Sequence, residues 1–237
     1  MDTPKRTLLI FGAGGDLTSR LLLPGIGQLL SSERGTSLEL IGVDRDARSD
    51  ADWQERVRAS FAAGKADPEK TRDVLEGARW LQADVTDPES LARVLTECAG
   101  GPAIYFALPP HVTVASCAAL ERIDLPDGTV LALEKPFGTD LKGARSLNRQ
   151  LLRLVPESSI QRVDHFLGKS TVLNVLGLRF ANRLFEAVWN SANLERVEIT
   201  YDESLGLEGR AGYYDRAGAM VDMIQSHLLL VMALVAM

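Results

Sequence analysis

The sequence has few of the residues that mark disulfide-rich or metal-binding proteins. Its 237 residues include two cysteines, Cys98 and Cys117, with no CxxC pattern. We therefore expect free thiols in a reducing cytoplasm rather than a disulfide framework. The three histidines, His111, His165 and His227, lack the spacing of metal ligands and have no cysteine beside them. This pattern predicts no metal site.

Excess positive charge and long apolar runs are also lacking. The net charge of −6 argues against broad binding to nucleic acid, because a phosphate backbone requires a basic surface. No stretch reaches the roughly 20 apolar residues that span a bilayer, and the N-terminal run "TLLIF" is too short for a secretory signal. The remaining composition, 46% hydrophobic and 24% charged, is ordinary for a soluble globular protein with a sizeable core.

The first part of the chain alternates strand-like and helix-like segments. Short runs rich in β-branched and aromatic residues predict strands at 7–11, 38–43, 103–108 and 129–134. Helical spacing predicts helices at 51–63, 88–98, 111–121 and 139–155. This alternation predicts a parallel sheet with crossover helices, which is a Rossmann-like α/β domain. We assign it to residues 1–163.

The pattern changes at about residue 164. A long helix is predicted at about 170–189, then an alternating strand at 194–204, a glycine-rich loop and a final helix. We assign residues 164–237 to the start of an α+β substrate and dimerisation domain. The last ten residues, "LLLVMALVAM", contain no residue that ends a helix. We therefore expect this second domain to be incomplete and the sequence to be truncated.

The first predicted strand ends in a glycine-rich turn, "FGAGGDLTSR". Gly12 and Gly14 fit the first two positions of the GxGxxG pattern, whereas Leu17 fills the third. Glycines let backbone N–H groups approach a pyrophosphate, and a helix N-terminus favours anions. An ordinary tight turn is the alternative, but the location at the first strand–helix junction favours a cofactor site. Its predicted members are Gly12, Gly14, Gly15, Asp16 and Leu17.

The second predicted strand ends in "GVDR", where dinucleotide-binding proteins select their cofactor. Asp44 is suited to the ribose 2′-OH of NAD, and Arg45 is suited to the 2′-phosphate of NADP. The two residues favour opposite cofactors, and a solvated strand end is a further alternative. Lys135 follows the apolar run "TVLALE" and is expected at the edge of the sheet where ligands bind.

The segment "RVDHFLGKS" is not a P-loop, because Val163 stands where that motif requires glycine. His165 and Lys169 are suited to donating hydrogen bonds to phosphate oxygens. Asp164 would repel a phosphate, so we expect it to orient a distant base. Further along, His227 lies on a largely apolar helix, where a carboxylate partner would make it a good general base. A solvated loop and a structural histidine are the alternatives.

Taken together, these segments resemble the glucose-6-phosphate dehydrogenase family. The matching strings run in the family's order: "FGAGGDLTSRLLLP", "ALPP", "EKPFGTDLKGARSLN", "RVDHFLGK", "LRFAN", "EGRAGYYDRAGAMVDMIQSHLL" and "LALVAM". The resemblance implies hydride transfer from C1 of glucose 6-phosphate to NADP, with NAD also possible, giving 6-phosphogluconolactone in the pentose phosphate pathway. It also implies that the full-length protein is a homo-oligomer.

The resemblance also implies individual roles. His227 resembles the base that takes the C1 hydroxyl proton, and Asp164 resembles its carboxylate partner. His165 and Lys169 resemble ligands of the sugar phosphate. The other implied contacts are Lys135 to both sugar and cofactor, and Glu203 and Asp222 to sugar hydroxyls.

Five positions depart from the family pattern. Gly14 replaces a usual serine, Asp44 a small residue, Phe166 a tyrosine, Val221 an arginine and Ser226 an asparagine. The changes at Gly14 and Asp44 bear on the choice of cofactor, and that at Phe166 removes a phosphate ligand. None of them removes the implied proton-transfer pair.

Three other kinds of protein share part of this pattern. "ADVTDPESL" after a glycine-rich turn is also typical of short-chain dehydrogenases and NmrA-like regulators, but the catalytic Tyr-x-x-x-Lys is absent. Sugar dehydrogenases of the glucose-fructose oxidoreductase type share the Glu-Lys-Pro strand end, but not the segments around His165 and His227. A truncated, catalytically weak relative that only binds nucleotide or a partner remains open.

Overall fold

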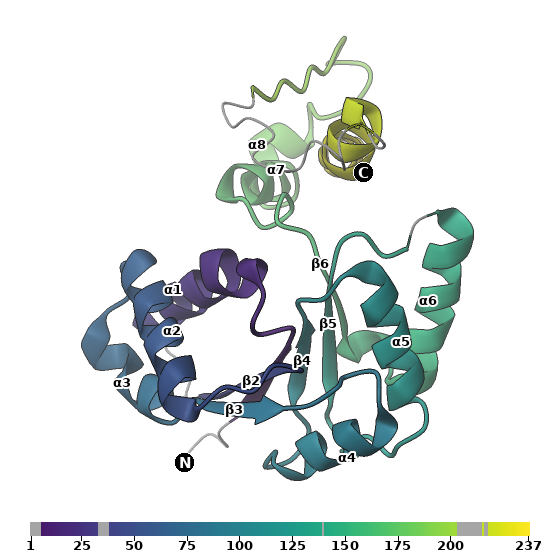
Figure 1. Ribbon diagram of the computed structural model, residues 1–237. Coiled ribbons are helices and arrows are strands. Elements are labelled where there is room, and N and C mark those ends of the chain that lie inside the picture. The colour runs from purple at the N-terminus through teal and green to yellow at the C-terminus, as the bar shows by residue number, and fades with distance from the viewer. Residues whose placement is uncertain (1–5, 33–37, 139, 203–214, 216–217) are drawn as a thin grey trace. The chain divides into compact units, whose positions relative to one another are not determined.

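The chain divides into two compact units, Met1–Val163 and Asp164–Met237. The computed structural model (Figure 1) describes residues 6–32, 38–138, 140–202, 215 and 218–237.

The first unit is built on a six-stranded parallel sheet. Its strands are β1 (Arg6–Phe11), β2 (Leu38–Asp44), β3 (Arg79–Gln82), β4 (Ala103–Phe106), β5 (Val130–Glu134) and β6 (Ile160–Val163). They are arranged in the order β3-β2-β1-β4-β5-β6, and all neighbouring strands are parallel. This is the strand order of the doubly wound dinucleotide-binding fold, so the predicted Rossmann-like class is confirmed.

Helices cover both faces of this sheet. They are α1 (Leu23–Ser31), α2 (Asp50–Ala63), α3 (Pro68–Glu76), α4 (Pro88–Thr96), α5 (Pro110–Leu120) and α6 (Leu141–Leu154). Figure 1 shows α1 to α3 grouped on one side and α4 to α6 on the other. Alternate residues of β1 serve the two cores: Leu9 and Phe11 pack in the cluster with Leu91, whereas Ile10 packs in the cluster with Trp53.

Side-chain caps determine where several of these helices begin. Ser49 accepts a hydrogen bond from Asp52 N–H at the start of α2, and Asp87 accepts one from Ser90 N–H at the start of α4. Proline stands in the first turn of α4, directly after the Asp87 cap, where its fixed φ suits a helix start. Helix α3 and strands β3 and β6 were not predicted from the sequence, and the two strands have only four residues each.

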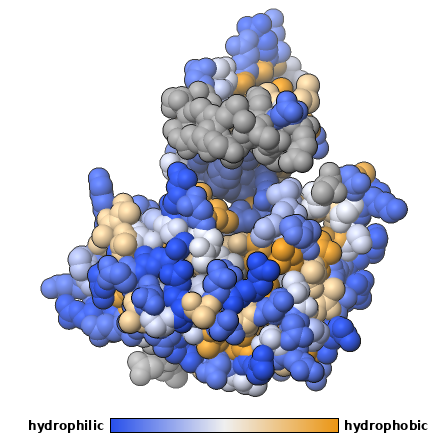
Figure 2. Space-filling view, in the orientation of Figure 1, coloured by the Kyte–Doolittle hydropathy of each residue, from blue (hydrophilic) through white to orange (hydrophobic). Residues whose placement is uncertain are grey.

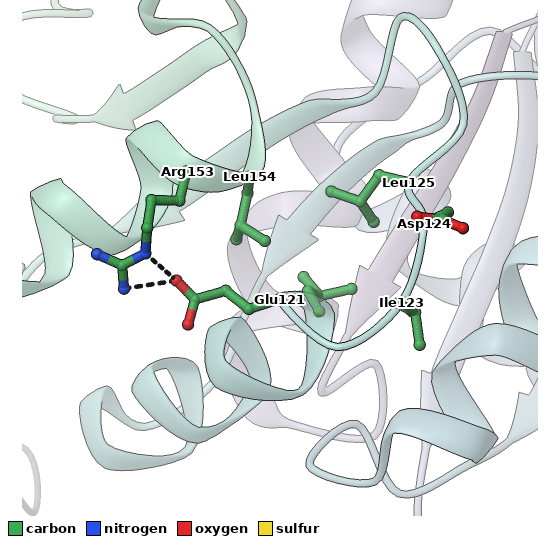
Figure 3. Close-up of a pocket in the computed structure, with 7 residues that line it drawn as sticks. Glu121, Ile123, Asp124, Leu125, Arg153 and Leu154 are labelled. Atoms are coloured by element: carbon green, nitrogen blue, oxygen red, sulfur yellow. Dashed lines mark hydrogen bonds and ion pairs between the residues drawn. The ribbon is translucent and has the colours of Figure 1, made fainter.

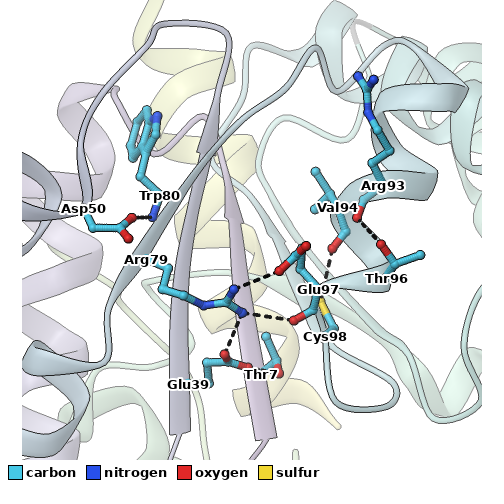
Figure 4. Close-up of polar contacts among 10 residues, drawn as sticks. All are labelled: Thr7, Glu39, Asp50, Arg79, Trp80, Arg93, Val94, Thr96, Glu97 and Cys98. Carbon is cyan, nitrogen blue, oxygen red and sulfur yellow. Dashed lines mark hydrogen bonds and ion pairs between the residues drawn. The ribbon is translucent and has the colours of Figure 1, made fainter.

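Polar contacts tie together the edge of the sheet where the strands begin (Figure 4). Arg79, the first residue of β3, donates to Glu39 of β2 at 2.8 Å and to Glu97 after α4 at 3.0 Å. Thr7 of β1 donates to the same Glu39 carboxylate at 2.8 Å. These contacts link three neighbouring strands to the segment that follows α4.

The second unit is mainly helical in its described part. It contains α7 (Ser170–Phe180), α8 (Arg183–Glu186), η3 (Met220–Leu228) and α10 (Leu229–Ala236). The prediction of one helix at 170–189 is wrong, because α7 ends at Phe180 and the Asn182 side chain caps α8 by accepting from Leu184 N–H. The strand predicted at 194–204 does not form over 194–202, and 203–204 lie outside the described residues. A strand needs a neighbour to satisfy its backbone groups, and alternation by itself does not supply one.

Candidate functional site

The glycine turn lies where the strand order reverses. Gly12 N–H donates to Val43 O at the end of β2 (2.9 Å), and Ala107 N–H, just after β4, donates to Phe11 O (2.9 Å). Gly12 has φ +80°, and a Cβ there would lie 2.4 Å from Ala107 O. Only glycine fits this close approach. In open α/β sheets this crevice, at the carboxyl ends of the strands, is where ligands bind.

A helical segment starts directly after the turn. Asp16 and Leu17 begin it, and it continues as the π-helix η1 (Thr18–Leu22) and then α1. Its first N–H groups therefore face the crevice, as a pyrophosphate site requires. The predicted cofactor residues from Gly12 to Leu17 thus occupy one continuous turn and helix start.

Asp44, the last residue of β2, is hydrogen-bonded to the glycine turn. Its Oδ2 accepts a hydrogen bond from Gly14 N–H at 2.9 Å, and its Oδ1 accepts one from Arg45 N–H at 2.8 Å. The Asp44 carboxylate is therefore fixed against the glycine turn. The side chain of Arg45 is exposed at the same strand end.

Two further arginines, Arg48 and Arg56, lie at this turn and were not predicted from the sequence. Arg56 of α2 donates through Nη2 to Gly14 O (2.9 Å), Gly15 O (2.8 Å) and Ser19 Oγ (3.0 Å). Burial, followed by the charge of neighbouring Arg48, lowers the pKa of Arg56. The available clue was helical spacing: Arg56 lies three residues after buried Trp53 and so borders the buried face of α2.

The residues at this turn fit a dinucleotide. Arg48 lies over the Trp80 ring with its guanidinium carbon 5.1 Å from the ring centroid. The Nε atoms of Arg48 and Arg56 are buried without a hydrogen-bond partner within the described part of the chain. Cationic donors of this kind, beside a glycine turn and a helix start, suit an anionic cofactor.

Lys135 lies at the same edge of the first unit, directly after β5. It is half-buried and precedes Pro136 through a cis peptide bond. The preceding Glu134 accepts a hydrogen bond from the Tyr105 hydroxyl. Burial, together with this bond, raises the pKa of Tyr105, so the phenol remains protonated.

In the second unit, three predicted site residues gather around Phe166. The rings of Phe166 and His227 stack with centroids 4.0 Å apart and an interplanar angle of 13°. His165 meets His227 edge-on at 4.9 Å, and Lys169 Nζ lies 4.3 Å from the Phe166 ring centroid. His227 and Phe166 are 8% and 5% exposed. The proposed base, His227, thus has an apolar neighbour. His165 and Lys169, the two residues predicted to donate hydrogen bonds to a phosphate, lie in the same cluster.

The remaining predicted residues of this unit are only partly placed. Asp164 Oδ1 accepts a hydrogen bond from Phe166 N–H at 3.0 Å, which holds the carboxylate at the start of this turn. Its pairing with His227 stays a prediction. Asp222 lies on η3, the π-helix that also carries His227, and π-helical turns are frequent at functional sites. Glu203 lies outside the described residues.

Three other features contribute nothing to these sites. A hollow of about 490 Å³ near the ends of α5 and α6 is crossed by an ion pair between Arg153 and Glu121 (Figure 3), and it lies at the opposite edge of the sheet from the glycine turn. The described residues include no group of three or more His, Cys, Asp or Glu placed to hold a metal ion. Among the described helices, none has the length and apolar character needed to cross a membrane.

The strand order, the glycine turn and the carboxylate at the end of β2 define a dinucleotide-binding protein of the doubly wound α/β class. Residues 9–174 match the family described as "Glucose-6-phosphate dehydrogenase, NAD binding domain", and residues 176–237 match its C-terminal domain. The chain belongs to the glucose-6-phosphate dehydrogenase family.

Named relatives agree with this assignment. A glucose-6-phosphate 1-dehydrogenase of Zymomonas mobilis is 37% identical over 240 residues, covering 98% of this chain and 50% of the relative. A cytoplasmic isoform from Solanum tuberosum is 34% identical, covering 98% and 49%. The chain therefore spans about half the length of the curated relatives it matches.

Two solved structures are similar to this protein over nearly the whole chain. The Mycobacterium avium glucose-6-phosphate 1-dehydrogenase has a TM-score of 0.86 at 34% identity, covering 99% of this chain and 52% of that one. A glucose-6-phosphate dehydrogenase in complex with its substrate glucose 6-phosphate has a TM-score of 0.86 at 30% identity, covering 100% and 53%.

Proposed function

We propose that this protein oxidises glucose 6-phosphate at C1 and transfers the hydride to NADP, or alternatively NAD, giving 6-phosphogluconolactone. This reaction belongs to the pentose phosphate pathway, and we place it in the cytoplasm. The arrangement of His165, Lys169 and His227 around Phe166 carries the proposal. Family membership and the relative solved with glucose 6-phosphate support it.

In this proposal the second unit handles both ends of the sugar phosphate. Lys169 and His165 donate to the phosphate oxygens, since charge-assisted hydrogen bonds are the strong ones. His227 takes the proton from the C1 hydroxyl, and Asp164 orients the His227 ring. Loss of that proton drives departure of the hydride from C1. The nicotinamide ring, when bound, accepts the hydride.

The first unit holds the cofactor in this proposal. Backbone N–H groups of the Gly12–Leu17 segment bind the pyrophosphate, and Arg56 keeps this turn in place through its bonds to Gly14 and Gly15. Lys135 contacts both sugar and cofactor. Glu203 and Asp222 are proposed to hold sugar hydroxyls. The full-length protein is proposed to be a homo-oligomer.

The test compares glucose 6-phosphate with glucose in steady-state assays that follow reduced nicotinamide, with the product identified by mass spectrometry. Lys169→Ala should lower kcat/KM for glucose 6-phosphate by roughly 10–100-fold, the scale of one charge-assisted contact. The same change should affect unphosphorylated glucose much less, because glucose has no phosphate for Lys169 to bind.

Lys142→Ala is the matched control, because Lys142 is an exposed lysine on α6. It should leave both sugars unaffected. Equal losses for the two sugars in Lys169→Ala would show that Lys169 does not bind the phosphate. Nucleotide binding without any turnover would favour the alternative of a catalytically weak relative.

A further inference from the structure

The carboxylate of Asp44 is fixed at the place where a dinucleotide's adenosine ribose is selected. Two backbone amides, those of Gly14 and Arg45, donate to its two oxygens at 2.9 and 2.8 Å. A carboxylate offers about four acceptor sites, so this one keeps capacity for two hydroxyl donors. Its negative charge is held in position by both bonds.

The position of the Asp44 carboxylate depends on the absence of a side chain at Gly14. A Cβ at position 14 would lie 2.9 Å from Asp44 Oδ2 and 3.5 Å from its Cγ. Real Cβ atoms do not approach an oxygen this closely, so any side chain at position 14 would displace the carboxylate. The serine that the family resemblance places at position 14 is therefore incompatible with Asp44 in its present position. The Asp44 carboxylate can therefore occupy its position because residue 14 is glycine.

Burial and then Arg48 lower the pKa of Arg56, whereas Asp16 and Asp44 raise it, so Arg56 partly offsets the Asp44 charge. The hydrogen bonds of the cations around the turn are nevertheless made elsewhere. Arg56 uses Nη2 for two carbonyls of the turn and for Ser19 Oγ, and Arg48 lies against Trp80. Arg45, the residue suited to a 2′-phosphate, is exposed. After the Thr86 hydrogen bonds and against some burial, the charge of Arg45 helps to lower the pKa of Asp84.

We propose that Asp44 and Gly14 select the unphosphorylated adenosine ribose, so that the chain binds NAD more tightly than NADP. The inference rests on the proposed dinucleotide-dependent function. Two ribose hydroxyls donate to the Asp44 carboxylate. A 2′-phosphate carries a charge of about −1.5 to −2 at neutral pH and meets like charge at this position, which disfavours its binding.

The test titrates the 237-residue chain with NAD and with NADP by isothermal calorimetry in the absence of sugar. NAD should bind at least about tenfold more tightly than NADP. Asp44→Ala should weaken NAD by about 10–100-fold, the scale of losing hydrogen bonds to a charged group, and should strengthen NADP, so that the preference reverses. Arg45→Ala should weaken NADP and leave NAD nearly unchanged.

Asp46→Ala is the matched control, because it removes the same charge from an exposed residue two positions further along. It should leave the NAD-to-NADP ratio unchanged. Gly14→Ser should weaken both nucleotides while Asp44 is present, and Gly14→Ser with Asp44→Ala should restore NADP binding.

Tighter binding of NADP than of NAD by the unsubstituted chain overturns the inference. So does a ratio of NAD affinity to NADP affinity that is the same in Asp44→Ala as in Asp46→Ala. Tighter binding of NAD supports the selectivity, whereas absence of glucose 6-phosphate oxidation by the full-length protein contradicts the proposed function and leaves the selectivity standing. Failure of both nucleotides to bind contradicts both proposals.

Discussion

Phe166 shows how one side chain organises the cluster in the second unit. Its ring stacks on His227 and lies 4.3 Å from Lys169 Nζ, and it meets the Tyr201 ring edge-on at 5.2 Å. The family resemblance implies a tyrosine at this position. Phenylalanine has no hydroxyl to donate to a phosphate, but it still supplies an apolar face for the proposed base. In the proposed function, phosphate binding would therefore depend more heavily on His165 and Lys169.

His227→Asn should lower kcat with glucose 6-phosphate by about 10²–10⁴, the usual scale for losing a general base. The fold should persist, as checked by circular dichroism, because asparagine fits the space and retains a polar end. Gln225→Asn, an exposed position on the same helix, is the control and should leave kcat nearly unchanged. Near-normal turnover by His227→Asn would remove this residue from the role of base.

At the scale of elements, the glycine turn depends on one backbone conformation. Gly12→Ala should destabilise the protein by about 1–3 kcal/mol, because a Cβ would meet Ala107 O and φ is +80°. Nucleotide binding should weaken with it. Urea unfolding and calorimetry measure the two effects.

Gly25→Ala is the matched control, since a Cβ at this position in α1 meets nothing within 4 Å. Alanine should stabilise this helix by about 0.5–1 kcal/mol. Equal effects of the two substitutions would show that the turn does not require glycine.

The polar contacts at the opposite edge make a separate prediction. Arg79→Met should lower the free energy of unfolding by about 1–3 kcal/mol, because it leaves the partly buried Glu39 carboxylate without one donor. Arg58→Met, which breaks an exposed ion pair with Glu55, should cost less than about 0.5 kcal/mol. Similar losses in chemical denaturation would argue that the Arg79 contacts are no better than surface pairs.

At the scale of the whole molecule, burial differs greatly between the two units. In the described part of the second unit, the buried side chains are Phe166, Val172 and His227. The first unit contains two extensive clusters of buried residues on the faces of its sheet. Figure 2 shows hydrophilic side chains over much of the visible surface of the first unit, with hydrophobic residues gathered near α5. Local stability should therefore be higher in the first unit.

Hydrogen–deuterium exchange measures this difference directly. Amides in β1 and β4 should exchange more slowly than those in α7 and α10 by roughly 100-fold or more, because opening free energies range from near zero to the global value. Uniform protection of both units would show that burial within each unit does not determine its stability.

The sequence by itself determined the features that depend on neighbouring residues. Alternating apolar segments predicted the Rossmann-like class, and the turn chemistry predicted the glycine turn at Gly12. Strand–turn–helix order also brought Lys135 to the ligand edge. These inferences succeeded because periodicity, capping and backbone sterics act over a few residues.

The tertiary structure decided what depends on residues far apart. The Asp44–Gly14 contact spans 30 positions, and Arg56 reaches Gly14 across 42. The stacking of Phe166 on His227 and the pairing of four-residue strands likewise have no local pattern. Such contacts arise when the packed sheet and helices bring separate segments together, and no spacing along the chain encodes that distance.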